Sequence, residues 1–91
     1  MSNKNQIKQL EDLNSSLAKE ILLNESAVYE VEKELQSLDS DLFHHPAIQP
    51  QIDELRALIL RLTNKNEVYK QEIYENDLEI TKLKKEDEGD E

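Results

Sequence analysis

The stretch "NSSLAKEILLN", residues 14–24, begins and ends with an asparagine, and apolar residues lie between the two at helical spacing. The stretch "NEVYKQEIYEN", residues 66–76, has the same form. In both stretches the asparagines occupy positions at which the surrounding sequence places large apolar side chains. A buried side-chain amide without a partner costs about 1–3 kcal/mol. The two stretches therefore predict that these amides meet one another when the chain folds.

Apolar residues recur at alternating spacings of three and four along both halves of the chain, which is the heptad pattern of a coiled coil. Each half has eleven consecutive a and d positions, and all are apolar except two asparagines. We call these positions the seam. In the first half the seam consists of Ile7, Leu10, Asn14, Leu17, Ile21, Asn24, Val28, Val31, Leu35, Leu38 and Leu42. In the second half it consists of Ile48, Ile52, Leu55, Ile59, Leu62, Asn66, Tyr69, Ile73, Asn76, Ile80 and Leu83.

Between the two runs lies "FHHPAIQP", residues 43–50, which predicts a break in the helix. Pro46 and Pro50 have no amide proton, and a proline pushes the residue before it away from helical angles. We therefore expect His45 and Gln49 to be non-helical, whereas Pro50 suits the first turn of a new helix. The expected organisation is one domain over residues 1–85, with helices over about 4–42 and 48–85 and a turn over about 43–47.

The end of the chain, "KKEDEGDE", has no large apolar side chain that could anchor it. Short polar ends without such anchors are commonly disordered. We expect residues 86–91 to form a disordered acidic tail.

Folding the chain back at about residue 45 brings together residues whose numbers add up to about 90. Asn14 then faces Asn76, and Asn24 faces Asn66. A shift by one heptad would bury each amide against an apolar side chain, so the four asparagines are predicted to set the register. The predicted fold is all-α, a two-helix antiparallel coiled-coil hairpin. Two chains that open at the turn and exchange helices would make the same contacts, although the prolines favour the closed hairpin.

The charges beside the seam differ between its two edges. One edge of the first helix is acidic (position e, for example Glu32 and Asp39) and faces basic residues such as Arg56. The other edge, at position g, is less regular and places Glu20, Glu34 and Asp41 opposite Lys65, Glu72 and Glu79. Like charges that face each other repel, so we expect the g edge to need a partner that covers it.

A hairpin that buried only its seam should be polar elsewhere, but nine large apolar residues of the two expected helices lie outside it. Single exposed apolar residues are common, whereas this number indicates a surface that docks further helices. Ordering the chain also costs roughly 1.5 kcal/mol per residue, which a two-helix seam barely offsets. We expect the hairpin to complete a four-helix or larger helical assembly with partner chains, as a homo-oligomer or a hetero-complex. The predicted partner-docking residues are Leu13, Leu22, Leu23, Tyr29, Leu58, Leu60, Val68, Tyr74 and Leu78.

The composition excludes several classes of function. With 21 acidic and 11 basic residues, the net charge of −10 repels nucleic-acid backbones and anionic membrane surfaces. No run of apolar residues approaches the length of a membrane span, and cysteine is absent. We expect a soluble intracellular protein of the cytoplasm or nucleus that binds protein helices, with no nucleic acid, membrane insertion or small-molecule substrate.

Residues that could carry chemistry are sparse. His44 and His45 are the only histidines, and neighbours in a turn rarely aim both rings at one metal. The single glycine, Gly89, cannot build a phosphate-binding loop. We expect no metal, no cofactor and no enzymatic activity. The sequence instead predicts a structural subunit of a multi-subunit complex, or alternatively a chaperone that shields a partner's amphipathic helix.

Overall fold

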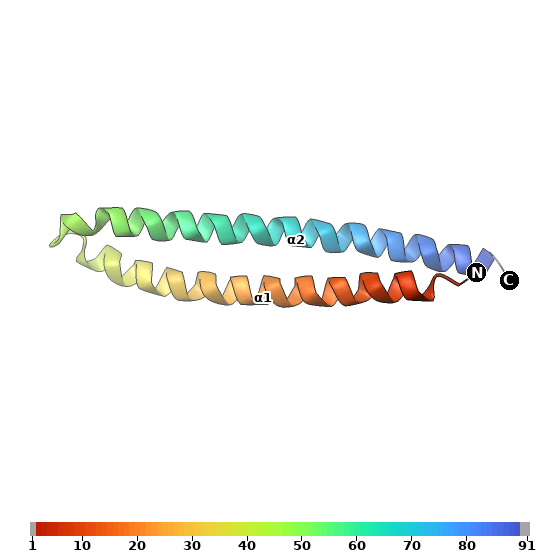
Figure 1. Cartoon of the computed structure of the whole chain (residues 1–91). Helices are drawn as coiled ribbons and strands as arrows, with labels where there is room; N and C mark the ends of the chain where they lie inside the picture. The colour runs from red at the N-terminus through yellow and green to blue at the C-terminus, as the bar shows by residue number, and fades with distance from the viewer. Residues whose placement is uncertain (1, 90–91) are drawn as a thin grey trace. The chain divides into compact units, whose positions relative to one another are not determined.

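The computed structural model describes residues 2–89, which form two α-helices and no β-strand (Figure 1). Helix α1 spans Lys4–Asp41, a short 3-10 helix η1 spans Pro46–Ile48, and α2 spans Gln49–Gly89. The predicted all-α antiparallel hairpin is confirmed. Three of the four helix ends lie within one residue of the prediction, because the heptad pattern stops where the prolines begin.

The helices pack as two units. The terminal unit combines residues 2–21 with residues 67–89, and the turn unit comprises residues 22–66. In each unit a stretch of α1 runs antiparallel beside a stretch of α2 (Figure 1). The turn unit contains the connection between the helices, and the terminal unit contains the start of α1 and the end of α2.

The turn forms where the sequence predicts it. The Asp41 carbonyl accepts hydrogen bonds from the backbone N–H groups of His44 (3.0 Å) and His45 (2.9 Å), which satisfies the end of α1. His45 has φ −137° and ψ 72°, so the predicted non-helical backbone before Pro46 is confirmed. The same prediction is wrong for Gln49, which has φ −52° and ψ −45°. Its N–H donates to the Pro46 carbonyl, and this bond offsets the strain that the following proline imposes.

Helix α2 continues through Gly89, so the disordered tail expected over residues 86–91 is wrong for residues 86–89; residues 90–91 lie outside the described residues. The reason is a tertiary contact that the local sequence does not reveal. The carboxylate of Asp87 accepts the backbone N–H of Asn3, at 3.0 Å from Oδ1 and 3.1 Å from Oδ2. Lysine and glutamate are also good helix formers.

The core of the hairpin is the predicted seam, and all of its residues are buried or half-buried. In the terminal unit Ile7, Ile80 and Leu83 form a buried cluster against which Leu10 packs. In the turn unit Ile52 is fully buried, with 0% of its surface exposed. The heptad pattern therefore identified the core.

Candidate functional site

The first polar layer of the seam lies in the terminal unit. Asn76 Nδ2 donates to Asn14 Oδ1 at 2.9 Å, which is the predicted contact. Asn14 Nδ2 in turn donates to Asp77 Oδ1 at 2.9 Å. Asp77 is exposed, so this third member adds a charge-assisted hydrogen bond at the edge of the layer.

The second polar layer lies in the turn unit. Asn24 Nδ2 donates to Asn66 Oδ1 at 2.8 Å, again the predicted contact. Asn66 is buried, with 5% of its surface exposed. Among the described residues no buried side-chain nitrogen or oxygen lacks a hydrogen-bond partner. That the asparagines set the register remains a prediction.

A third polar layer, which the sequence analysis missed, closes the end of the terminal unit. Asn3 donates its backbone N–H to Asp87 and its Nδ2 to the Leu83 carbonyl and to Glu86 Oε2, both at 3.3 Å. The Asp87 carboxylate thus lies at the N-terminus of α1, where the helix dipole favours a negative charge. The signal was available, because the numbers of Asn3 and Asp87 also add up to 90.

Within residues 2–89 the acidic e edge forms an ion pair with α2 at one place. Arg56 Nη2 lies 3.7 Å from Asp39 Oδ1, in the turn unit. Both side chains are about half exposed, so the pair contributes at most about 1 kcal/mol. Lys70 lies instead 3.6 Å from Glu67 of its own helix.

The turn unit exposes four of the predicted docking residues on its surface. Leu22, Leu23, Tyr29 and Leu60 each expose 60–64% of their surface. Leu58 is an exception, because its g position adjoins the seam and leaves it half-buried. Leu58 is thus less accessible than the other four, and its part in docking remains a prediction.

Tyr29 and Leu60 lie on the same side of the turn unit. Tyr29 and Asp39 line one open hollow on α1, and Asp39 contacts Arg56 of α2. Leu60 follows Arg56 by four residues, so it lies on the same face of α2.

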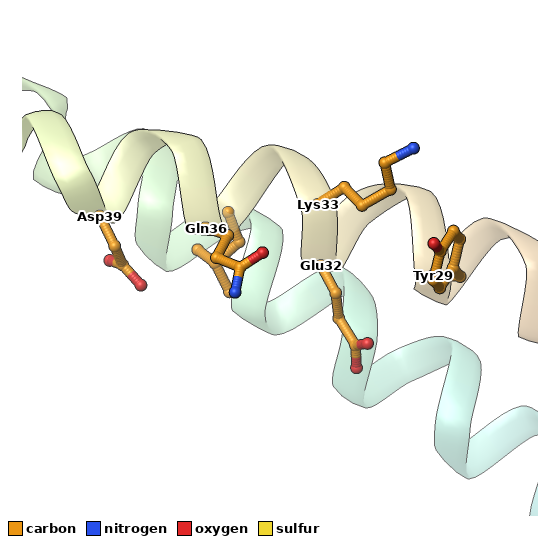
Figure 2. A pocket seen from close by; sticks show the side chains of 6 residues that line it. Tyr29, Glu32, Lys33, Gln36 and Asp39 are labelled. Atoms are coloured by element: carbon orange, nitrogen blue, oxygen red, sulfur yellow. The ribbon is translucent and has the colours of Figure 1, made fainter.

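Charged side chains surround this hollow. Figure 2 shows Glu32, Gln36 and Asp39 projecting to one side of α1, with the Lys33 ammonium on the other side. The Lys33 ammonium lies 5.4 Å from the centre of the Tyr29 ring, which is a cation–π distance. The hollow is open to solvent on a single helix, so it offers a contact surface and no enclosed site for a substrate.

Phe43, in the turn, was not predicted as a docking residue. It is 88% exposed, and its ring meets the His44 ring edge to face at 5.3 Å. Its heptad position, b, is that of Leu22 and Tyr29, which is the signal that could have identified it.

The terminal unit exposes the remaining predicted docking residues. Val68, Tyr74 and Leu78 are more than half exposed, and Leu13 is 43% exposed. Leu13 lines a groove between α1 and α2, together with Leu10 and Leu83 of the seam. Glu79 also lines this groove, together with Gln6 and Gln9, so apolar side chains lie beside one carboxylate and two amides.

No group of three or more His, Cys, Asp or Glu side chains in residues 2–89 could hold a metal ion. Neither helix, over its described length, has an apolar stretch that could cross a membrane.

No protein-family model matches the chain, and neither does any curated protein or solved structure. Its function must therefore be argued from the sequence and the geometry.

Proposed function

We propose that this chain is a non-enzymatic interaction subunit, which docks helices of other chains onto the exposed apolar side chains of its hairpin. The observation that carries the proposal is the side of the turn unit that presents Tyr29 and Leu60. Both residues expose about three fifths of their surface. Leu22, one heptad before Tyr29, extends the same apolar row on α1.

The energetics of a small hairpin support this proposal. Fully burying a large apolar side chain contributes about 1.5–3 kcal/mol. A small domain of this size buries too little surface to be more than marginally stable by itself. Covering Leu22, Tyr29 and Leu60 with a helix would therefore stabilise the hairpin and the complex together.

The open shape of the hollows supports a non-enzymatic role. Catalytic sites are concave and exclude water around a nucleophile and its base. The hollow beside Tyr29 is lined by one helix face and is bordered by solvated charges. Such a surface suits a helix better than a small substrate.

The experiment that tests the proposal is purification of the tagged chain from its native source, followed by measurement of the mass and stoichiometry of the complex. The test variant carries Leu22→Glu and Leu60→Glu. The control carries Ser26→Glu and Asn64→Glu, which add the same charge at exposed outer positions of the same unit. We expect a stoichiometric helical complex that the test variant loses and the control keeps.

The composition of the complex then separates the alternatives. A complex of identical chains means a homo-oligomer, and one with other chains means a hetero-complex. A partner that dissociates from the chain once its own assembly is mature would favour the chaperone role. A test variant that assembles as the wild type does would contradict the proposal. Circular dichroism of the isolated variants checks that both remain helical.

A further inference from the structure

The groove of the terminal unit is lined by both apolar and polar side chains. Its apolar lining consists of Leu10 and Leu83 of the seam and of Leu13. Its polar lining is one carboxylate, from Glu79, and the amides of two glutamines of α1. A further hollow on α2 is lined by Val68, which is 63% exposed, and by glutamates around it.

The side of the terminal unit on which the groove lies carries mainly negative charges. The c and g positions of the two helices point to this side, and those in the unit carry five acidic residues and one basic residue, a net charge of −4. The acidic residues are Glu20, Glu72, Glu75, Glu79 and Glu86, and the basic one is Lys82.

These carboxylates are arranged unfavourably for the isolated hairpin. Glu75 lies three residues after Glu72 and four before Glu79, so all three are neighbours on the surface of α2. Like charges at these spacings repel each other and destabilise a helix. Glu20 of α1 occupies the g position that faces Glu72 and adds to the repulsion. A cationic partner would turn this repulsion into attraction.

We infer that the groove binds an amphipathic helix of a different protein, with an apolar stripe that contacts Leu13 and Val68 and with lysine or arginine residues flanking the stripe. Charge complementarity disfavours a symmetric dimer of this chain through the groove. A symmetric dimer places the same patch on both sides of the interface, so it would bring the same glutamates together. The inference rests on the proposed function, because Leu13 and Val68 belong to the predicted docking set, but it concerns the other unit.

The probe is a pair of synthetic helical peptides of 21 residues, roughly the length of six turns. Both have leucine along one face, and the flanking positions are lysine in one peptide and glutamate in the other. Each is titrated calorimetrically into the full chain. We expect saturable binding of the lysine peptide that weakens as salt is raised, and no binding of the glutamate peptide.

Two variants with the same net charge locate the binding site. Glu72→Gln with Glu79→Gln removes two charges from the groove side, and Glu32→Gln with Glu54→Gln removes two from the turn unit. We expect the groove variant to weaken binding of the lysine peptide about tenfold or more, since several charge contacts are lost together. The control variant should change it less than about twofold. Leu13→Ser should weaken binding at unchanged charge.

Three results would overturn the inference: binding of neither peptide, equal binding of both, or equal losses in the groove and control variants. The last result would mean that only the overall charge attracts the peptide. Failure here is distinguishable from failure of the proposed function. The Leu22→Glu and Leu60→Glu variant tests assembly through the turn unit. If this variant loses assembly but the wild-type chain does not bind the lysine peptide, the proposed function stands and only the inference about the groove is contradicted.

Discussion

The side-chain amide of Asn76 donates a hydrogen bond to the side-chain oxygen of Asn14 at 2.9 Å, across 62 positions of sequence. Both residues occupy seam positions that are otherwise apolar. A displaced register would leave each amide against a hydrocarbon side chain. We therefore expect the pair to contribute specificity more than stability, which is a known use of polar residues in coiled coils.

Replacement of Asn14 alone should be more harmful than replacement of the pair. Asn14→Leu leaves the half-buried Asn76 amide without its acceptor, which should lower the free energy of unfolding by about 1–3 kcal/mol. Adding Asn76→Leu should restore or raise stability, because two apolar side chains then meet. Urea denaturation followed by circular dichroism measures both. A double variant no more stable than the single one would show that the pairing is wrong.

The contact between Asn3 and Asp87 should stabilise both ends of the terminal unit. Asp87→Ala removes the carboxylate from the N-terminus of α1 and should lower the free energy of unfolding by about 0.5–2 kcal/mol. Hydrogen exchange of the Asn3 amide should also become faster. Glu88→Ala removes the same charge from an exposed neighbour and serves as the control. Equal effects of the two variants would mean that the contact contributes nothing specific.

Two large-to-small replacements in the turn unit should differ sharply. Ile52→Ala creates a cavity at a fully buried position and should cost about 2–5 kcal/mol of unfolding free energy. Leu60→Ala changes a side chain that is 62% exposed and should cost less than about 0.5 kcal/mol in the isolated hairpin. Thermal denaturation at low protein concentration compares them. Similar losses would mean that Leu60 is already covered, for example by a second copy.

The prolines should keep the hairpin closed. Replacing Pro46 and Pro50 by alanine removes the restriction on His45 and restores two amide donors, so the break between the helices becomes less favoured. We expect a larger share of two-chain species that have exchanged helices. Light scattering over a range of concentrations detects them, since their mass is twice that of one chain. The same mass distribution for the variant and the wild type would contradict the claim that the prolines keep the hairpin closed.

Sequence reasoning identified the seam because its information is local. The heptad spacing predicts which side of each helix is apolar, and the matched positions of the asparagines predict which residues face each other. The same pattern identified most of the exposed apolar residues, since whatever lies outside the seam of a two-helix hairpin stays on its surface. Leu58 departs from this rule, because a g position lies close enough to the seam to be half covered.

The tertiary structure decided what local pattern could not. Asp87 looked like part of an unanchored polar tail, but its carboxylate accepts the backbone N–H of Asn3, 84 positions earlier, and α2 continues past it. Gln49 precedes a proline, yet its bond to the Pro46 carbonyl holds it in a helical conformation. The acidic groove beside Leu13 exists only where two helices meet. By itself the sequence determined the helices, their direction and their pairing, because these follow from periodicity. Packing decided the chain ends, the turn and the surfaces, because these depend on residues far apart in sequence.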